Sequence, residues 1–490
     1  MLTEKEIYTI ISEDKNSDRK SRARLGRRYY NGDHDIKDCR LFYFNSDGKL
    51  VEDKTRSNVK ITHPFFTELT DQCVQYMLSG VGKSDNGKSV SGLVFSEIPE
   101  LQKRLDTYFG DDFISELSDT LTDVCACGFG YMYAFMSAEK RTSFMYADCM
   151  GVAEVMAKDA NDSIEYVVYW YIDRVDKGNK KIKRIQVWDN KQVTYFTEIN
   201  DGEIILDTDR KINPRPHIVT SSEDSEDKFG SSFGYIPFFR IDADRRQTSH
   251  LKPVKALIDD YDLISCGLTN NIQDIADAVY VVKGFEGENF DELQKNIKTK
   301  KMIGVSDGGG VEVLTTQIPV EARKAKLELD EKNIYRFGMG FNSAQVGDGN
   351  ITNIVLKSRY ALLDMKCNKL EKKLRAFLKG LIKIVLDEIN GEMGTAYSLS
   401  DVEIRLTREI MSNALDNAQI DSIQAQTKQT EVNTLLNAAS QLGEESVLEA
   451  LCNLLDLDID KVKEALNERT EDDTHTVLNA LESVGADSDE

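Results

Sequence analysis

The longest regular hydrophobic pattern in the chain lies between residues 353 and 390. Apolar residues recur there at alternating spacings of four and three without a slip, and this heptad register predicts one continuous helix. At about 1.5 Å per residue, the helix would be roughly 57 Å long. A core helix or a simple coiled coil would show the same pattern, but the sequence has no second heptad run of this length, so neighbouring subunits are its expected partners. The apolar positions are Leu356, Tyr360, Leu363, Cys367, Leu370, Leu374, Phe377, Leu381 and Ile384.

The first half of the chain changes from helical to strand-like patterns. Residues 1–30 and 64–79 show helical spacing, and Pro64 stands where the missing N–H of a first-turn proline costs little. Between residues 130 and 207, short β-rich runs alternate with turns that contain Asp, Asn and Gly. This alternation predicts an antiparallel meander, followed by one more strand, YIPFFRI, after an acidic loop at 221–229.

Helical patterns dominate again beyond residue 250. A helix is predicted over 251–279, then short strands and a small helical piece over 280–318, then a charged helix from 319 to about 336. The stretch that follows, FGMGFNSAQVGDGNIT, is rich in Gly, Asn and Ser and cannot pack a core of its own, so it predicts a flexible loop. Helices return between about 408 and 470. The mixture of helices and an antiparallel meander predicts an α+β fold.

Composition and charge limit the class of protein. The chain has 490 residues, 40% hydrophobic and 30% charged, an ordinary globular balance that suggests about three domains. Its net charge of −22 argues against a protein whose whole surface grips nucleic acid, although an acidic wall lets DNA slide past without sticking. The polar N-terminus is unlike a signal peptide, and Lys379 and Lys383 interrupt the most apolar run. The sequence therefore predicts a protein that is cytosolic at synthesis and spans no membrane.

The cysteines do not show the spacing of a metal site. Eight are scattered along the chain, only Cys125 and Cys127 lie close together, and no pair has Cys-x-x-Cys spacing. The run LDLDID at 455–460 resembles a calcium loop but lacks Gly at the sixth position, so we interpret it as a turn and helix cap. The sequence predicts reduced core cysteines, no bound metal and no cofactor.

One motif points to an enzyme. Residues 82–89, Gly-Lys-Ser-Asp-Asn-Gly-Lys-Ser, match the P-loop pattern letter for letter, and a P-loop ATPase would use Lys88 on the phosphates and Asp387 on magnesium. Such a loop must follow a buried strand and open a helix, so that backbone N–H groups converge on the phosphates. Here the motif follows a helical segment and precedes a short strand, and Asp387 falls in the long heptad helix. We interpret 82–89 as a turn and keep the ATPase as an alternative.

A second motif resembles a nucleophile elbow. Residues 230–234, Gly-Ser-Ser-Phe-Gly, place Ser232 at its centre. An elbow needs a strand, a sharp turn and then a helix, whereas an acidic loop precedes this motif and a strand with Pro237 follows it. His217 and His250 lie nearby in sequence, but nothing fixes either as a base. The sequence therefore predicts no catalytic residue.

Three stretches of the chain, taken in their order, resemble a known family. They are RRYYNGDHDI at 27–36 with HPFFTELTDQCVQYMLSG at 63–80, then 237–284, and the helical end at 437–468. The chain resembles the portal family of long-tailed bacteriophages. The resemblance implies a portal fold with a β-rich wing and N-terminal helices at 1–250 and stem helices at 251–279 and 319–338. It further implies a small α/β clip at 280–318, a tunnel loop at 339–352, a long wing helix with a return strand at 353–410, a mostly helical crown at 411–470 and an acidic tail at 471–490.

The resemblance also implies a function and partners. The chain would form a homo-oligomeric ring of twelve copies at the portal vertex of the virion capsid, assembled in the host bacterial cytoplasm, through which double-stranded DNA is packaged and ejected. Its expected partners are the DNA, the terminase large subunit, a head-completion (adaptor) protein, and the major capsid and scaffolding proteins. Another structural ring protein of a phage particle is a second alternative.

Two sets of polar side chains are candidate contacts of such a channel. On the loop, Asn342, Gln345, Asp348 and Asn350 would touch DNA, since amides contact phosphates without long-range attraction, and Gly338, Gly340, Gly347 and Gly349 would let each copy move. In the clip, Lys295, Lys298, Lys300 and Lys301 would meet phosphates or an acidic partner, or form a solvated cluster. The basic run at 15–28 is able to bind phosphate, but a solvated or inter-subunit face is expected.

Overall fold

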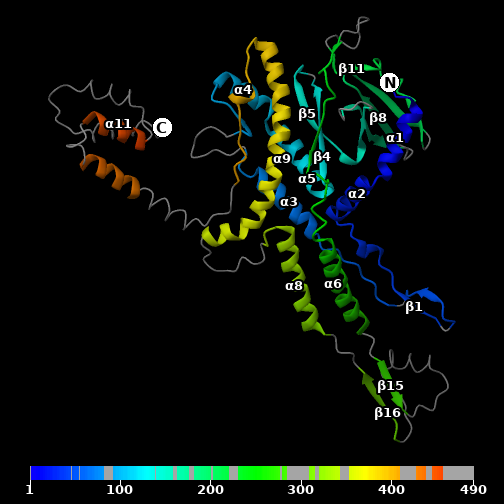
Figure 1. Cartoon of the computed structure of the whole chain (residues 1–490). Helices are drawn as coiled ribbons and strands as arrows, with labels where there is room; N and C mark the ends of the chain where they lie inside the picture. Colours follow the sequence, from blue (N-terminus) through cyan, green and yellow to red (C-terminus); the bar gives the residue numbers. More distant parts are fainter. Residues whose placement is uncertain are drawn as a thin grey trace. The chain divides into compact units, whose positions relative to one another are not determined.

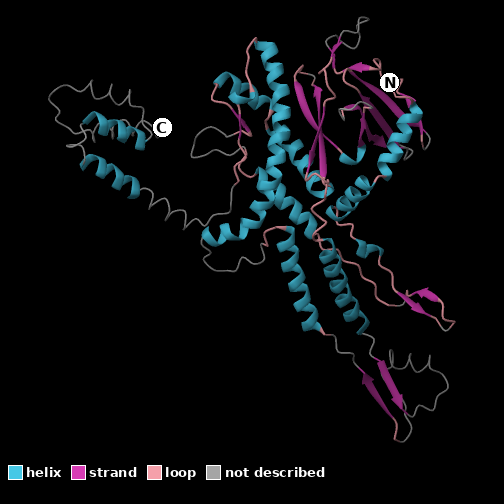
Figure 2. Cartoon of the chain, in the orientation of Figure 1, coloured by secondary structure: helices cyan, strands magenta, loops and turns pink. Residues whose placement is uncertain are grey.

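The chain folds as two compact units, which are described separately. One contains Met1–Gly347 and Arg359–Glu409, and the other contains Asp348–Ser358 and Ile410–Glu490. Helices and antiparallel strands are mixed in the first unit, which confirms the α+β class (Figure 2). The computed structural model describes residues 2–45, 47–54, 56–81, 92–137, 139–157, 163–175, 181–199, 202–219, 230–275, 279–283, 308–314, 319–342, 353–408, 426–437 and 444–455.

Two helices, α1 (Glu4–Asn16) and α2 (Asp18–Tyr30), open the chain, as the helical spacing over 1–30 predicts. α1 begins with a capping box, in which Glu6 N donates to Thr3 Oγ1 and Thr3 N donates to Glu6 Oε2. Ser17 ends α1 and caps α2, since Lys20 N donates to its hydroxyl at 3.2 Å. A short 3₁₀ helix, η1 (Asp35–Asp38), leads to a hairpin of β1 (Phe42–Phe44) and β2 (Leu50–Glu52).

Three helices lie between the hairpin and the sheets: α3 (Phe65–Leu78), α4 (Pro99–Tyr108) and α5 (Asp111–Cys127). Pro64 precedes the first residue of α3, as predicted. Between α3 and α4, the short strand β3 (Val94–Phe95) pairs with β17 (Glu403–Ile404), which follows the long helix. This pairing joins two segments about 300 residues apart in the sequence.

The predicted antiparallel meander is confirmed over residues 152–206, whereas residues 129–147, most of which lie in the predicted range, belong to a second sheet. Its strands run in the order β10-β9-β8-β7-β6, and β11 adds to β9 at one edge. A smaller sheet with the order β14-β4-β5 includes the strand predicted around YIPFFRI (Figure 1). The bounds are β4 (Phe129–Met136), β5 (Thr142–Ala147), β6 (Val152–Met156), β7 (Ile164–Val175), β8 (Lys181–Trp188), β9 (Gln192–Ile199), β10 (Glu203–Leu206), β11 (Arg215–Pro216) and β14 (Phe238–Asp242).

The core lies on both faces of the meander. On one face, α1 contributes Ile7 and Ile11, which pack with Trp170 and Ile185 of the sheet. On the other, Trp188 and Tyr169 join a larger cluster that includes residues of α2, α3, α5 and the smaller sheet. Neighbouring residues of one strand, such as Tyr169 and Trp170, therefore belong to clusters on opposite faces of the sheet, because successive side chains of a strand point to opposite sides.

Two further helices, α6 (Lys255–Ile275) and α8 (Val320–Gly338), pack against each other. Near them in sequence, β15 (Val279–Lys283) pairs antiparallel with β16 (Gly310–Leu314). Lys326 of α8 pairs with Asp260 of α6 and with Asp330 of its own helix. The helices therefore match the spacing predicted for 251–279 and 319–338, with two exceptions at the first helix. It begins four residues later than predicted, after turns around Pro253, and Val279 belongs to β15 and not to the helix.

The longest helix is α9 (Asn353–Met393), where the heptad pattern predicts it. Its seam is not left for neighbouring subunits, and that expectation is wrong: Leu363, Leu374 and Leu381 are buried within the chain. Several short elements cover the helix in place of one long partner. Tyr76 of α3 donates to Asp364, Arg375 donates to the Ile404 carbonyl, and Thr142 N donates to Glu388. Toward its end the buried side shifts to Ile382, Val385 and Ile389, as the drift of a straight helix against a strict heptad requires.

The second unit is described in part. Residues 426–437 are helical, and α11 (Glu444–Leu455) follows, with Val447, Leu451 and Cys452 buried. Helices in this region agree with the pattern predicted for 408–470. The acidic residues 471–490, the run at 455–460 apart from its first residue, and the predicted helical piece of 280–318 lie outside the described residues. Among the helices that the structure describes, none combines the length and the apolar character of a membrane span.

Candidate functional site

An extended segment, residues 57–63, lies along one side of α6. The backbone N–H groups of Ser57, Val59, Ile61 and His63 donate in turn to the side chains of Asp274, Asn270, Cys266 and Asp262, at 2.7–3.1 Å. The donors are two residues apart in the extended segment, a rise of about 6.6 Å. The acceptors are four residues apart in α6, a rise of about 6.0 Å, so successive donors and acceptors remain opposite one another. The helix therefore holds the strand-like segment that connects the β1–β2 hairpin to α3.

Two histidines meet a carboxylate at the inner end of this segment. Asp262 is fully buried and lies 2.6 Å from His34 Nδ1 and 2.7 Å from His63 Nδ1. Burial alone would raise the pKa of Asp262, but the hydrogen bonds from His34 and His63 outweigh it and lower that pKa. Through these contacts, His34, which follows α2, and His63, which precedes α3, are both held at Asp262 of α6.

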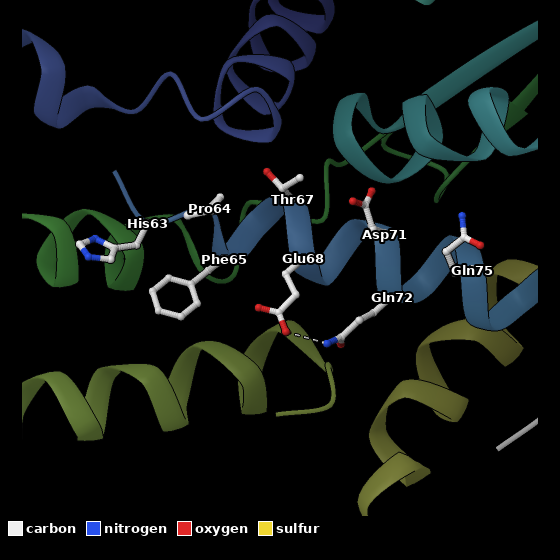
Figure 3. Close-up of a pocket in the computed structure, with 8 residues that line it drawn as sticks. All are labelled: His63, Pro64, Phe65, Thr67, Glu68, Asp71, Gln72 and Gln75. Atoms are coloured by element: carbon white, nitrogen blue, oxygen red, sulfur yellow. Dashed lines mark hydrogen bonds between the residues drawn. The ribbon is translucent and has the colours of Figure 1, made fainter. Parts of the chain in front are cut away.

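A groove of about 660 Å³ is lined by residues of α3 and by His63 and Pro64, which precede it (Figure 3). Gln72 binds both backbone groups of Phe341, donating to its carbonyl at 2.8 Å and accepting from its N–H at 2.9 Å. Glu68 accepts from Gln72 at 3.0 Å and from the hydroxyl of Tyr335 at 2.5 Å. The lining residues are His63, Pro64, Phe65, Thr67, Glu68, Asp71, Gln72 and Gln75.

The first residues of the predicted tunnel loop are anchored firmly. Met339, the residue that follows α8, is in the left-handed conformation with φ 54°, and Gly340 N donates back to Tyr335 O at 2.9 Å. The ring of Phe341 stacks on Tyr360 of α9, with ring centres 4.5 Å apart. Residues 339–342 therefore connect α8 to α3 and α9 and form a fixed start for the loop.

Two of the four loop glycines have a different role from the predicted one. A Cβ at Gly338 would lie 2.6 Å from Leu69 Cδ1, and one at Gly340 would overlap Leu69 Cδ2. Leu69 is itself 1% exposed, so it has no space to move. The prediction that Gly338 and Gly340 provide freedom of motion is wrong, because they permit close packing against α3. Gly347 and Gly349 lie outside the described residues.

Among the predicted contact residues, the structure describes one. Asn342 Nδ2 donates to Glu331 Oε1 of α8 at 2.9 Å, so the amide is engaged within the chain. Its contact with DNA stays a prediction. The other candidates lie outside the described residues: Gln345, Asp348 and Asn350 of the loop, and Lys295, Lys298, Lys300 and Lys301 of the clip.

The basic run at 15–28 is in part a core feature. Lys20 is fully buried, and its ammonium donates to the carbonyls of Cys149 at 2.5 Å and Val152 at 2.8 Å. Arg27 pairs with Asp123 at 2.7 Å and Asp148 at 2.6 Å. The expectation that the basic run forms a solvated or inter-subunit face is therefore wrong for Lys20 and Arg27, because carbonyl and carboxylate oxygens from distant segments of the same chain bind their charged groups. Arg22 and Arg24 are exposed.

Neither enzyme motif gains support from the described residues. The P-loop candidate at 82–89, with Lys88, lies outside them, while Asp387 lies on the exposed side of helix α9 and not on a strand. Ser232 follows the two-residue strand β13 (Gly230–Ser231), which pairs with β12 (Ile218–Val219), and β14 comes next in place of a helix. His217 stacks on Phe233 at 5.7 Å between ring centres, and its two buried ring nitrogens have no hydrogen-bond partner among the described residues.

Apolar side chains are exposed on the helix pair and the hairpin. In α6, the exposed fraction is 54% for Leu263 and 58% for Ile272. The two residues are nine positions apart, and a helix turns by about 100° per residue, so their side chains lie on opposite sides of the helix. In α8, Leu329 and Phe337 are about half exposed. The β1–β2 hairpin exposes Phe42, Tyr43, Phe44 and Leu50. Such a concentration on extended elements is typical of a protein–protein interface.

Comparison with known proteins places these features in a family. The model of the family described as phage portal protein, SPP1 Gp6-like, matches residues 11–472. The chain is 28% identical to the portal protein of Bacillus phage SPP1 over 356 residues, which cover 72% of this chain and 67% of that protein. It is 24% identical to the portal protein of Clostridium phage phiCD119 over 436 residues, 84% of this chain and 88% of the relative. The chain therefore belongs to the SPP1 Gp6-like family of phage portal proteins and is a structural portal subunit.

Proposed function

We propose that twelve copies of this chain form a ring at one capsid vertex, around a channel through which double-stranded DNA is packaged and later ejected. Membership of the portal family supports the proposal. The structural observation that carries it is the pair of exposed apolar residues on opposite sides of α6, Leu263 and Ile272. A closed ring needs two different faces on each subunit, so that the face on one side meets the other face of its neighbour.

We assign the parts of the ring to the described elements. The N-terminal helices and the sheets of residues 1–250 form the wing, and α6 and α8 form the stem. The β15–β16 pair belongs to the clip within 280–318, α9 crosses the wing, and the helices after residue 411 form the crown. The packing of α6 on α8 and the pairing of β15 with β16 support this arrangement, since they give a paired helical segment with a paired strand segment near it in sequence.

The channel would guide DNA without binding it tightly. The chain carries a net charge of −22, and a ring multiplies that charge, so repulsion centres the DNA. The tunnel loop 339–352 would contact the DNA through Asn342, Gln345, Asp348 and Asn350, and the anchoring of residues 339–342 to α3 and α9 would give the loop a fixed start. The clip lysines Lys295, Lys298, Lys300 and Lys301 would meet phosphates or an acidic surface of the motor.

The partners follow from this position in the particle. The clip would dock the terminase large subunit during packaging and a head-completion (adaptor) protein afterwards. The wing and crown would meet the major capsid and scaffolding proteins, and assembly would take place in the host bacterial cytoplasm. No catalytic group is needed, because the chain is a passage and the motor is a separate protein.

Mass photometry and negative-stain electron microscopy of the purified chain test the proposal. We expect rings with a central channel, whose size in solution need not equal that in the capsid. A monomer at micromolar concentration, or a solid particle without a channel, would contradict it. Calorimetry with magnesium-ATP tests the ATPase alternative: the portal subunit should bind none, and a Lys88→Ala variant should be indistinguishable from the wild type.

A further inference from the structure

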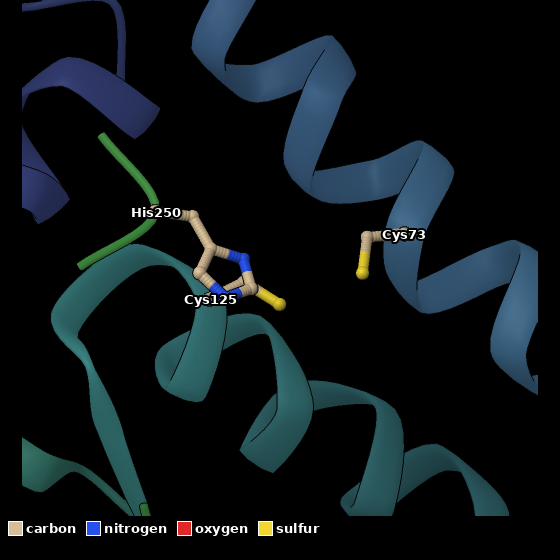
Figure 4. A group of neighbouring side chains, drawn as sticks. All are labelled: Cys73, Cys125 and His250. Atoms are coloured by element: carbon tan, nitrogen blue, oxygen red, sulfur yellow. The ribbon is translucent and has the colours of Figure 1, made fainter. Parts of the chain in front are cut away.

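Two cysteines and a histidine from distant parts of the sequence meet in the core of the first unit. Cys73 lies in α3, Cys125 in α5, and His250 in the turn that precedes α6 (Figure 4). One ligand atom of each, the two Sγ atoms and a ring nitrogen, lie within 4.8 Å of one another. The sulfurs and the imidazole point toward one another in Figure 4. The three residues therefore offer ligands of the types that zinc prefers.

A third cysteine lies beside one member of this set. Cys367 of α9 places its Sγ 3.7 Å from Cys73 Sγ. In a tetrahedral site with Zn–S bonds of about 2.3 Å, two sulfurs are separated by about 3.8 Å. The observed separation matches that edge and is far longer than the bond of about 2.05 Å that a disulfide requires. Cys367 is not in the group whose ligand atoms all lie within 4.8 Å of one another, so its side chain would have to move closer to that group to complete a Cys₃His structural zinc site.

The protein backbone holds these ligands in place. His250 N donates to the Cys125 carbonyl at 3.0 Å, which keeps the histidine beside the end of α5. All three thiols are inaccessible to solvent, and the buried His250 Nδ1 has no hydrogen-bond partner. A buried polar atom without a partner costs free energy, and coordination of a metal would remove that cost.

A second group in the same unit serves as a contrast. Asp123, Cys127 and Cys149 also lie close enough to share an ion. The Arg27 guanidinium already occupies that group, donating to Asp123 at 2.7 Å and to Cys149 Sγ at 3.5 Å. A cation would have to displace Arg27 from this position. The Cys73 group holds no such cation between its ligands among the described residues.

We propose that Cys73, Cys125, Cys367 and His250 bind one Zn²⁺ in a closed, structural site. On binding, the three thiols release their protons to solvent and coordinate as thiolates, while the imidazole binds through its neutral nitrogen. The buried ammonium of Lys366, next to Cys367 in α9, supplies a compensating positive charge and is held by the carbonyls of Leu69 and Gly338. The ion would join α3, α5, α9 and the start of α6.

The sequence shows no signal for this site because its ligands come from four separate segments. Most structural zinc sites take two ligands from one tight turn, and the Cys-x-x-Cys spacing reports that turn. Here each ligand comes from a different element, and only tertiary packing brings them together. The absence of Cys-x-x-Cys spacing is therefore compatible with a site of this construction, although the prediction of no bound metal is not.

Zinc content of the full-length chain tests the proposal. The protein is purified with reductant, stripped with chelator, and dialysed against Zn²⁺ alone, and bound metal is counted by plasma mass spectrometry. We expect one Zn²⁺ per chain and a higher thermal midpoint than in the stripped protein. Replacement by Co²⁺ should give the visible absorption of a tetrahedral ion with thiolate ligands. This readout on the wild type does not depend on whether a variant folds.

Variants locate the ion. Cys73→Ser and Cys367→Ser should lose the bound equivalent and the Co²⁺ absorption, whereas Cys149→Ser, from the group occupied by Arg27, should retain both. The proposal is overturned if the stripped wild type accepts no Zn²⁺ while its thiols are free, or if Cys73 and Cys367 are joined in a disulfide. It is overturned equally if Cys149→Ser alone loses the metal.

Discussion

At the scale of single residues, Lys20 shows how a charged side chain is accommodated in the core. Burial lowers the pKa of its ammonium, and Asp14, at 3.1 Å, opposes that shift. We expect Lys20→Met to lower the free energy of unfolding by about 1–3 kcal/mol, because the carbonyls of Cys149 and Val152 lose their donor. Denaturant unfolding followed by tryptophan fluorescence measures the change. Arg22→Met, at an exposed position of the same helix, is the control and should be neutral.

A second residue, Asp262, predicts a dependence on pH. Its folded pKa is lowered, so its contribution to stability is complete above the unfolded value of about 3.9 and is lost as the pH falls through the folded value. We expect the thermal midpoint of the wild type to fall more steeply below about pH 4 than that of Asp262→Asn. At neutral pH, the variant should be less stable by about 1.5–3 kcal/mol, the loss of a charged hydrogen bond. An equal acid slope in both proteins would refute the assignment, and exposed Glu328→Gln should behave as wild type.

At the scale of elements, the contact of α8 with α3 depends on two glycines. Gly340→Ala should cost about 1–3 kcal/mol, because its Cβ would overlap the buried Leu69 side chain. Gly380 is a matched control: it lies inside α9, and no atom lies within 4 Å of an added Cβ. Gly380→Ala should therefore raise stability by about 0.5–1 kcal/mol through helix propensity. Thermal midpoints of the two variants should move in opposite directions, and a shared direction would contradict this account.

Elements with regular local patterns could be predicted, and those held by distant partners could not. The heptad of α9 and the alternation of the meander are local, so their existence and type are confirmed by the structure. The segment 57–63 alternates apolar and polar residues only over Val59 to Thr62, and its hydrogen bonds go to side chains of α6, more than 190 residues away, which no local pattern reports. The hairpin was missed for a related reason: its apolar residues Phe42–Phe44 are consecutive and exposed.

At the scale of the whole molecule, the order of elements and of the three resembling stretches predicted the family correctly, whereas the short enzyme motifs did not. The family is confirmed over residues 11–472, whereas the letter-perfect P-loop pattern gained no support. Individual site residues could not be predicted equally well, because a role depends on neighbours from other segments. Asn342 is engaged by Glu331, Lys20 donates to the carbonyls of Cys149 and Val152, and Cys73 meets its partners across the core.

Ring closure gives the last prediction, at the same scale. If Leu263 and Ile272 lie in the two different interfaces of each subunit, Leu263→Glu and Ile272→Glu should each weaken assembly, because each introduces a charge into an apolar contact. Mixing the two single variants should allow dimers but not restore rings, since at most every second contact would then join two intact faces. Mass photometry should show smaller species for both variants, with wild-type helix content by circular dichroism. Gln273→Glu, at an exposed position beside Ile272, is the control and should still form rings. Intact rings in both the Leu263→Glu and the Ile272→Glu variants would place the interface elsewhere.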